Sequence, residues 1–433
     1  MSVAARKLIA LVCAVLFATI VIAQAKSDAV TASPESVGFS SERLERLHAL
    51  IQSEVDRQEL AGAITILARH GKIVDYRTYG KRDLASGAPM AKDTIFRDYS
   101  MTKPITGVAM MVLYEQGKWL PSDPISKFIS EFAHLKVYAG KDADGKMILA
   151  DPDHAPTMGE LMSHTAGFTY GMAQYDDPVN TMYRDLHVMD SKNLQEMVDK
   201  LAKIPLLYQP GKGWMYSASM DIEGYIVEKL SGKSLPDFVH DNITAPLGMV
   251  DSGFYVPADK RSRFATLYKA GPDGKVVVDD RPDRYATQPT MPSGGGGMVS
   301  TAMDYYRFAQ MLANGGELDG HRVLAPSSVK LMGSNHVPAE LLNGHWGIGR
   351  HIMSPGFGYG FNCAVVFDPA AAELPVGKGT FFWDGAAGTW FWIDPTNDIV
   401  FVGMIQRMTA PDNHPLLYES HAVVYGALVD PKK

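Results

Sequence analysis

The sequence predicts an α+β fold, an α/β sandwich in which an antiparallel sheet flanked by helices is built from both ends of the chain. Strand-like runs gather near the two termini, whereas the middle of the chain is richer in helix and loop signals. Since a strand needs neighbours to satisfy its backbone hydrogen bonds, we expect the two sets of strands to share one sheet. The middle segment is then expected to form a mostly helical lobe inserted between them.

The N-terminal part contributes one helix and a hairpin. A Ser-Ser-Glu sequence is typical of a helix N-terminus and predicts a helix over 41–57. Two runs rich in β-branched and aromatic residues follow, over 62–69 and 72–80, and His70-Gly71 lies between them. Two such runs around a short Gly-containing turn predict a β-hairpin.

The remaining elements follow in chain order. An apolar run over 105–113 predicts a buried helix. A further helix is expected over 302–313, and the most strand-like runs of the chain lie at 379–383, 389–393 and 399–406.

These signals divide the chain into a leader (residues 1–25) and one folded domain (26–433). Within the domain, we expect the α/β part at about 26–120 and 291–433 and the helical lobe at about 121–290.

The leader is typical of a secretory signal peptide. Arg6 and Lys7 precede an apolar stretch from Leu8 to Ala23, and Ala23-Gln24-Ala25 has the small residues of a cleavage site. The apolar stretch is shorter than the roughly 20 residues that a membrane span needs. We expect an exported protein, periplasmic or secreted, with no stable membrane insertion after cleavage. An uncleaved N-terminal anchor is the alternative.

Composition limits the possible partners. The full chain has a net charge of −7, and cleavage of the leader would remove two basic residues and no acidic one. A negative net charge argues against nucleic acid or an anionic membrane surface as a partner. Of the two cysteines, Cys13 lies in the leader, so the mature chain would hold only Cys363 and no intramolecular disulfide. Stability must then come from the core, and a chain of 433 residues with 46% hydrophobic residues can bury a large one.

The pattern Ser100-x-x-Lys103 places a hydroxyl and an amine one helical turn apart. Side chains at i and i+3 share one face of a helix, so Lys103 is expected to reach the Ser100 hydroxyl. A serine becomes a nucleophile when a neighbouring base takes its proton, and a helix N-terminus favours developing negative charge. The pattern therefore predicts a serine acyl-transfer enzyme. A second copy, from Ser327 to Lys330, follows Pro326 at a surface-type helix start, and we interpret it as structural.

Two further segments carry candidate groups. Tyr216 precedes a predicted helix at a turn, where its phenol could face a cleft, although packing alone is the simpler interpretation. With an ordinary pKa of about 10, it would need a cation such as Lys103 nearby to act as a base. Trp383-Asp384-Gly385-Ala386 ends a predicted strand, and a backbone N–H there could form an oxyanion hole together with that of Ser100. A plain hairpin turn is the alternative.

Other chemistries are not indicated. The sequence has no His-Glu-x-x-His pattern and no paired Cys/His spacing, so neither a metal nor a cofactor is predicted. It has no Gly-x-Ser-x-Gly pattern, which removes the nucleophile elbow of the α/β-hydrolases. His164 follows a helix signal, where a capping or core role fits better than that of a triad histidine.

Taken in order, the motifs resemble the serine β-lactamase-like superfamily, most closely class C β-lactamases and the family VIII carboxylesterases built on that fold. The likeness runs from about residue 35 to 425, and its strongest parts are Ser100-Met101-Thr102-Lys103, 161–168, Tyr216-Ser217, 294–320 and 383–395.

The resemblance implies a mechanism. Ser100 would attack an acyl carbonyl and form an acyl-enzyme, which water then hydrolyses. Lys103 and Tyr216 would share the general-base work, and Ala386 would supply the second oxyanion N–H beside that of Ser100. Which of Lys103 and Tyr216 takes the first proton stays open, because such a pair titrates as a unit.

The chain departs from the β-lactamase pattern in two places. Tyr216-Ser217-Ala218 stands where many β-lactamases and penicillin-binding proteins have Tyr-x-Asn. Trp383-Asp384-Gly385 stands where they have Lys-Thr-Gly, whose lysine helps to bind a substrate carboxylate that Asp384 would repel. Tryptophan at this position resembles the esterase branch. We therefore expect Trp383, Asp384 and Gly385 to contact the substrate and to favour a neutral ester.

The expected function is that of a carboxylesterase on small to medium acyl esters, a small-molecule substrate class. The alternative is a β-lactamase or D,D-peptidase that acts on β-lactams or cell-wall peptides. Acyl transfer or amide hydrolysis on the same scaffold, and an inactive binding protein, stay open as well. The natural substrate, the acyl chain length and the oligomeric state are left undetermined.

Overall fold

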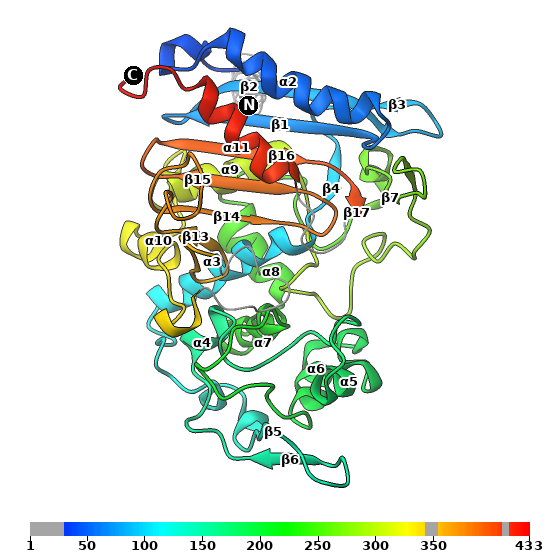
Figure 1. Cartoon of the computed structure of the whole chain (residues 1–433), viewed down its shortest axis with the longest axis vertical. Helices are drawn as coiled ribbons and strands as arrows, with labels where there is room; N and C mark the ends of the chain where they lie inside the picture. The colour runs from blue at the N-terminus through cyan, green and yellow to red at the C-terminus, as the bar shows by residue number, and fades with distance from the viewer. Residues whose placement is uncertain (1–29, 343–353, 409–414) are drawn as a thin grey trace, which may run out of the picture.

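The computed structural model describes residues 30–342, 354–408 and 415–433, so the predicted signal peptide lies outside the described residues. The centre of the molecule is an eight-stranded sheet (Figure 1). In order across the sheet, its strands are β12 (Phe357–Tyr359), β13 (Ala364–Val366), β14 (Thr380–Asp384), β15 (Trp390–Asp394), β16 (Ile399–Met404), β1 (Gly62–Arg69), β2 (Lys72–Asp83) and β3 (Ala88–Pro89).

Each strand of this sheet is antiparallel to its neighbours. β1 pairs with β16, so the two ends of the chain meet inside the sheet. The predicted antiparallel sheet built from both chain ends is therefore confirmed. In the β1–β2 hairpin, His70 and Gly71 have φ angles of 53° and 68°. Positive φ at both central residues is typical of a type I′ turn, whose twist matches that of the two strands.

The helices are, in chain order, α2 (Ser41–Asp56), α3 (Thr102–Glu115), α4 (Met158–Met162), α5 (Pro178–Asp185), α6 (Leu194–Leu201), α7 (Ser219–Ser231), α8 (Leu235–Val239), α9 (Ala302–Ala313), α10 (Pro326–Met332) and α11 (Pro415–Ala427). The N-terminus of α2 has the expected cap, because Ser40 Oγ accepts a hydrogen bond from the Arg43 N–H. Among the described residues, no helix is long and apolar enough to cross a membrane.

Helices cover both faces of the sheet (Figure 1). On β15, the Trp392 ring lies 4.1 Å from the ring of His421 in α11. The next-door Phe391 points to the opposite face, where its ring lies 5.1 Å from that of Tyr305 in α9. Successive residues of a strand face opposite sides of a sheet. The central strands are therefore buried on both faces, which explains why they are apolar throughout rather than alternating with polar residues.

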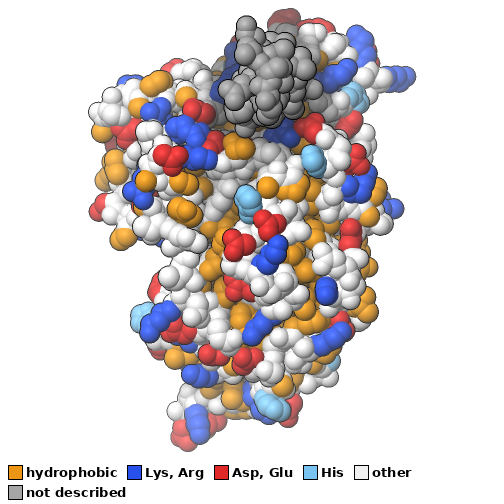
Figure 2. Space-filling view, turned by 180° about the vertical axis from the view of Figure 1, so that it is seen from behind, with side chains coloured by type: hydrophobic (Ala, Val, Ile, Leu, Met, Phe, Trp, Pro, Cys, Tyr) orange, Lys and Arg blue, Asp and Glu red, His pale blue; other side chains and the backbone are white. Residues whose placement is uncertain are grey.

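Residues 121–290 hold α4 to α8 and four short strands. The helices α4 to α7 lie on the far side of α3 from the sheet (Figure 1). The short strands are β5 (Val137–Lys141), β6 (Met147–Ala150), β7 (Tyr268–Ala270) and β8 (Val276–Val278). The helices α4 to α7 with β5 and β6 form the mostly helical lobe of the predicted fold, whereas β7 and β8 form a small sheet with β17 (Arg407–Met408), which follows β16 of the central sheet. Figure 2 shows the face behind that of Figure 1, where basic and acidic side chains are intermingled.

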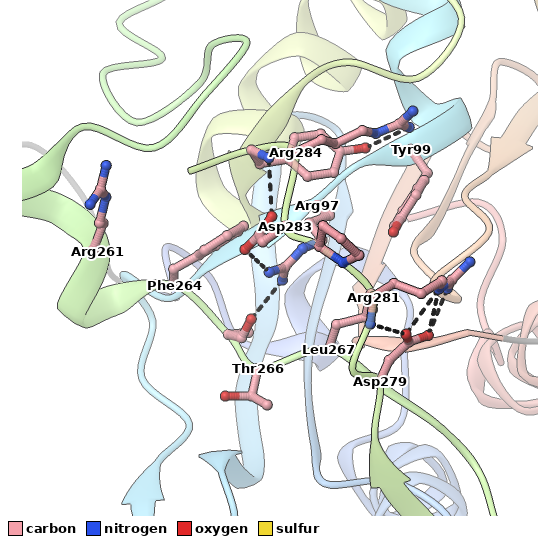
Figure 3. A pocket seen from close by; sticks show the side chains of 13 residues that line it. Arg97, Tyr99, Arg261, Phe264, Thr266, Leu267, Asp279, Arg281, Asp283 and Arg284 are labelled. Carbon is pink, nitrogen blue, oxygen red and sulfur yellow. Dashed lines mark hydrogen bonds and ion pairs between the residues drawn. The ribbon is translucent and has the colours of Figure 1, made fainter. Parts of the chain in front are cut away.

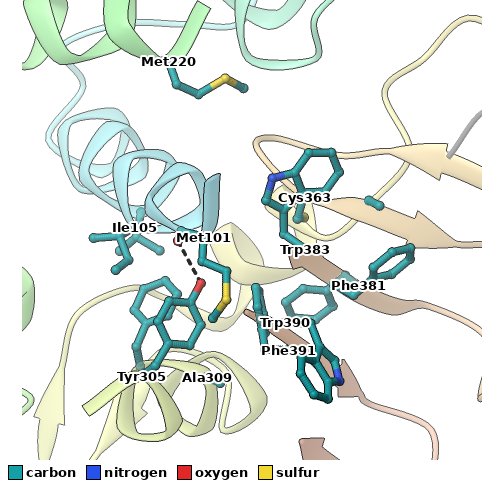
Figure 4. Close-up of a cluster of buried hydrophobic side chains, with 14 of the residues drawn as sticks. Met101, Ile105, Met220, Tyr305, Ala309, Cys363, Phe381, Trp383, Trp390 and Phe391 are labelled. Carbon is teal, nitrogen blue, oxygen red and sulfur yellow. Dashed lines mark hydrogen bonds between the residues drawn. The ribbon is translucent and has the colours of Figure 1, made fainter. Parts of the chain in front are cut away.

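The helix α3 lies between the lobe and the sheet and packs against α7, α8 and α10. Its residues from 102 to 111 are all buried, which is why its sequence shows a continuous apolar run. Figure 4 shows Met101 and Ile105 at its N-terminal end among the large apolar side chains of the core. There, the Tyr305 hydroxyl donates a hydrogen bond of 2.9 Å to the Met101 carbonyl. The core thus holds the turn at the start of α3 in place.

Candidate active site

Ser100 lies in the short 3₁₀ turn η2 (Tyr99–Met101), which leads directly into α3. Tyr99 has a φ of 45°, a value that bulky residues rarely adopt. Such strain persists when the surroundings hold it, and here the Met101 N–H donates to the Asp98 carbonyl at 3.1 Å. The tight turn presents Ser100 at the N-terminal end of a buried helix.

Lys103 contacts Ser100 as the spacing predicts, with 3.1 Å between Lys103 Nζ and Ser100 Oγ. Its ammonium also donates to the Gly295 carbonyl at 2.6 Å and lies 3.5 Å from the Tyr170 hydroxyl. Burial is the main cause that lowers the pKa of Lys103 to about 7, and the negative charge of Asp221 opposes it. A lysine with such a pKa can give up its proton near neutral pH, as a general base must.

Tyr216 contacts the same hydroxyl, and its phenol donates a hydrogen bond of 2.7 Å to Ser100 Oγ. Burial raises the pKa of Tyr216 well above its ordinary value, against the opposing effect of the Ser100 hydrogen bond. The ring of Tyr216 also lies 4.5 Å from Lys103 Nζ, in a cation–π arrangement. Near neutral pH, Tyr216 is thus a neutral phenol that can donate a proton.

His164 lies beside Tyr216 and supports it. Its Nδ1 lies 2.9 Å from Ser217 Oγ, and its carbonyl accepts a hydrogen bond from the Met215 N–H at 3.1 Å. The His164 ring lies 5.0 Å from the Tyr216 ring, and burial lowers the pKa of His164 well below its ordinary value. A neutral, buried histidine beside the tyrosine fits the core role expected from the sequence.

The end of β14 approaches the nucleophile turn closely. A Cβ on Gly385 would stand 2.3 Å from the Asp98 carbonyl oxygen, so glycine permits this approach. The Gly385 N–H donates to the Thr389 carbonyl at 2.8 Å, and Ala386 lies in the turn that follows. Within the described part of the chain, the N–H groups of Ser100 and Ala386 donate no hydrogen bond to another protein group. Two such donors at this junction suit an oxyanion hole.

Trp383 and Asp384 precede this junction. Trp383 is only 4% exposed, and its ring lies 5.8 Å from that of Tyr216 and 5.2 Å from that of Tyr359. It therefore forms a rigid support for Tyr216. The half-buried Asp384 contributes to the electrostatic environment of Lys103, where its negative charge works against the lowering of the lysine pKa. A direct contact of Trp383, Asp384 and Gly385 with substrate stays a prediction.

A buried polar network behind Lys103 was not predicted from the sequence. Asp221 in α7 accepts hydrogen bonds from the Tyr170 hydroxyl at 3.1 Å, from the Gly295 N–H at 3.2 Å and from Ser293 Oγ. It thereby holds both the loop and the phenol that Lys103 contacts. The available signal was an acidic residue in the first turn of the helix that follows Tyr216. It becomes informative only once α7 is known to pack against α3.

Glu223 lies in the same helix and was also missed. Its Oε2 accepts a hydrogen bond of 2.6 Å from Asn362 Nδ2, and the same amide donates to the Lys103 carbonyl at 3.3 Å. Burial raises the pKa of Glu223 to about 8. Near neutral pH this carboxyl is therefore mostly protonated, so it attracts a proton on Lys103 less strongly than a carboxylate would.

The other candidates lie apart from this site. Ser327 and Lys330 are exposed on α10. Within the ranges that the structure describes, no group of three or more His, Cys, Asp or Glu side chains could hold a metal ion. That the chain needs no metal or cofactor stays a prediction.

The chain is similar to known proteins over most of its length. The model of the Beta-lactamase family matches residues 47–425. Protein Rv1367c of Mycobacterium tuberculosis (strain ATCC 25618 / H37Rv) is 36% identical over 83% of this chain and 89% of its own length. Esterase EstB of Burkholderia gladioli is 32% identical over 80% of this chain and 86% of its own. The structure of "EstCE1, a hydrolase with promiscuous acyltransferase activity" superposes with a TM-score of 0.74 at 26% identity, covering 89% of this chain and 98% of that one.

Proposed function

The chain belongs to the β-lactamase family and is a serine hydrolase, and we propose that its activity is that of a carboxylesterase on small to medium acyl esters. One observation carries the proposal: Ser100 Oγ lies 3.1 Å from Lys103 Nζ and 2.7 Å from the Tyr216 hydroxyl. A hydroxyl held between a base and a proton donor has what nucleophilic acyl transfer requires. The esterase named among the relatives supports an ester as the substrate.

The proposed reaction follows from the charge states of the three groups. Lys103, with a pKa of about 7, accepts the proton of Ser100 as Ser100 Oγ attacks the ester carbonyl carbon. The N–H groups of Ser100 and Ala386 stabilise the negative charge on the carbonyl oxygen. The carbon–oxygen bond to the alcohol then breaks, and Tyr216 passes a proton to the departing oxygen. Tyr216 regains this proton from Lys103. Water attacks the acyl-enzyme in the same way and releases the acid.

Esters are favoured over β-lactams by the side chains at the end of β14. The position at which the resemblance places a carboxylate-binding lysine holds Trp383, which is packed between Tyr216 and Tyr359. The next residue, Asp384, carries a negative charge that repels a carboxylate at that place. The β-lactamase or D,D-peptidase alternative therefore has the weaker support.

The proposal includes export of the enzyme. Residues 1–25 would direct the chain out of the cytoplasm and be removed, leaving a domain at 26–433 with its lobe at about 121–290. Mass spectrometry of the protein recovered from the periplasm or the medium is expected to show an N-terminus at Lys26. A full-length chain held in the membrane fraction would support the uncleaved anchor instead.

The activity is tested by steady-state hydrolysis of p-nitrophenyl acetate, p-nitrophenyl butyrate and the chromogenic cephalosporin nitrocefin. We expect ester turnover to dominate and to vanish in Ser100→Ala. Ser327→Ala serves as the matched control, because it removes the serine of the second Ser-x-x-Lys copy and should keep full activity. Faster turnover of nitrocefin than of both esters would favour the β-lactamase alternative.

A further inference from the structure

A cavity of about 470 Å³ opens beside the nucleophile turn (Figure 3). Tyr99, the residue before Ser100, forms part of its wall, and so does Arg284. Arg284 Nη2 donates to the Gly296 carbonyl at 3.2 Å, next to the Gly295 carbonyl that accepts from Lys103. The cavity therefore adjoins the candidate active site.

The lining of the cavity is rich in arginine. It includes four guanidinium groups and two carboxylates: Arg97, Arg261, Arg281, Arg284, Asp279 and Asp283. Two of the arginines are neutralised by ion pairs. Arg97 at the end of β4 (Ile95–Arg97) lies 2.5 Å from Asp283, and Arg281 lies 2.6 Å from Asp279 (Figure 3).

The other two arginines, Arg261 and Arg284, form no ion pair with a carboxylate in the part of the chain that the structure describes. Arg261 donates to the Ala286 carbonyl. Arg284 donates to the Tyr285 hydroxyl at 3.1 Å and to the Gly296 carbonyl, in both cases through Nη2. A guanidinium has five N–H donors in a fork that matches a carboxylate. Most donors of Arg284 are thus available to a ligand.

Two aromatic rings fix the position of this guanidinium. The Arg284 Cζ lies 5.6 Å from the ring centre of Tyr99 and 5.2 Å from that of Tyr285. Its charge also reaches Lys103, because Arg284 helps to lower the pKa of that lysine. Among the described residues, Arg284 is therefore a positioned cation without a carboxylate partner, at the border between the cavity and the nucleophile.

We propose that this cavity is the acyl subsite and that Arg284 binds a carboxylate at the far end of the acyl chain. The substrates would then be monoesters of dicarboxylic acids. This inference rests on the proposed esterase function, since it concerns the substrate of the same site. Neither Ser100 nor Tyr216 lines the cavity, so it would receive the far end of the acyl chain and not the reacting ester group.

The charges around the site agree with this assignment. Asp384 repels an anion at the end of β14. This is the place where the resemblance puts the lysine of the β-lactamase Lys-Thr-Gly motif. The loop that carries Arg284 places the positive charge in another part of the site. A substrate carboxylate would therefore be directed away from β14 and into the cavity.

The test compares two p-nitrophenyl esters of adipic acid, one with a free carboxylate at the far end and one with a methyl ester there. For the wild type we expect kcat/KM to favour the free carboxylate at least fivefold at low ionic strength. Added NaCl at 0.5 M should reduce this preference, because exposed charges are screened by salt. Arg284→Gln should abolish the preference, and Arg284→Lys should restore part of it.

The preference, expressed as the ratio of the two rates, is the readout, because any effect of Arg284 on Lys103 changes both rates alike. Arg43→Gln is the matched control: it removes one exposed arginine from α2, on the sheet side of the molecule, and should keep the ratio. A wild-type ratio near one, or an unchanged ratio in Arg284→Gln, would overturn the inference.

Two further outcomes separate this inference from the proposed function. Turnover of the methyl-capped ester that is lost in Ser100→Ala, without any preference for the carboxylate, rejects the acyl subsite and leaves the esterase standing. No turnover of either ester rejects both. A preference seen only when the carboxylate is on the alcohol part, as in 3-butyryloxybenzoate against its methyl ester, would overturn the acyl assignment.

Discussion

Lys103 and Tyr216 contact the same hydroxyl oxygen, and burial moves their pKa values in opposite directions. A buried ammonium loses its charge more readily than one in water, and a buried phenol acquires charge less readily. One group is thereby ready to accept a proton near neutral pH, while the other keeps its own. At the scale of single residues, the difference in role between these two side chains comes from desolvation rather than from their chemical type alone.

The first prediction concerns the pH dependence of ester hydrolysis. The pKa of Lys103 is lowered to about 7, so the amine is charged and inactive as a base well below pH 7 and neutral above it. We expect kcat/KM to rise with an apparent pKa of about 7 and to stay level to about pH 9, since Tyr216 remains protonated. The apparent value belongs to the coupled groups as a set. A profile that is flat down to pH 5.5 would contradict the role of Lys103.

The second prediction concerns the phenol. Tyr216→Phe keeps the ring that packs on Trp383 but removes the proton donor to Ser100. We expect kcat to fall by about 10² or more, with an unchanged circular dichroism spectrum, because proton transfer by a positioned side chain contributes roughly that factor. Tyr225→Phe is the control, since it removes another buried hydroxyl of the lobe, bonded to Gln195, and should stay near wild type. Equal losses in both variants would argue against a specific role for Tyr216.

At the scale of elements, the site depends on how closely β14 approaches the turn before α3. The turn carries Ser100, and the strand end carries Ala386, so the distance between these two elements sets the geometry of the oxyanion hole. Gly385 permits the contact, because its missing side chain leaves room for the Asp98 carbonyl. The helix α7 adds the third element, with Asp221 and Glu223 behind Lys103.

The third prediction tests this approach. In Gly385→Ala, the new Cβ would stand 2.3 Å from both the Asp98 carbonyl oxygen and Thr389 Oγ1, so β14 must move away from the turn. We expect esterase activity to fall at least about 10²-fold, as for loss of an oxyanion donor, and the free energy of unfolding to fall by about 1–3 kcal/mol.

Gly426→Ala is the control for that experiment. Apart from its chain neighbours and the backbone of α11, no described atom lies within 4 Å of the position that its Cβ would take, and alanine favours a helix over glycine. This variant should keep activity and gain slightly in stability. Full activity in Gly385→Ala would show that the close approach is not needed for catalysis.

At the scale of the whole molecule, the two ends of the chain hold each other. β1 and β2 from the N-terminal part pair onto β16 from the C-terminal part, and α11 closes one face of the sheet. The buried ring of His421 in α11 has no hydrogen-bond partner among the described residues, and it lies 4.1 Å from the ring of Trp392 at an interplanar angle of 45°. Burial lowers the pKa of His421 to about 3.

The fourth prediction follows from this histidine. Below pH 6.5, His421 is protonated in the unfolded chain, whereas in the folded chain it stays neutral down to about pH 3. His421 therefore lowers the free energy of unfolding progressively as the pH falls from 6.5 to about 3. His421→Leu removes the titration. We expect the variant to unfold at a higher urea concentration than the wild type at pH 4.5, and we expect a smaller difference between the two midpoints at pH 8. A difference independent of pH would indicate packing alone.

The sequence by itself determined the features that depend on short range. The contact between Ser100 and Lys103 follows from helical spacing, and apolar runs near both termini predicted the strands of one sheet. Motif order, through the resemblance that it carries, added Tyr216 and Ala386 as candidates and the esterase as the expected function. Each of these features can be predicted because local geometry or a characteristic motif determines it.

Only the tertiary structure decided the rest. It brought the Tyr216 hydroxyl to Ser100 across 116 residues of sequence, placed Asp221 and Glu223 behind Lys103, and opened the arginine-lined cavity beside Tyr99. The tertiary structure also causes the lowered pKa of Lys103. Desolvation and charge depend on every element that packs around a group, and no spacing along the chain records which elements those are.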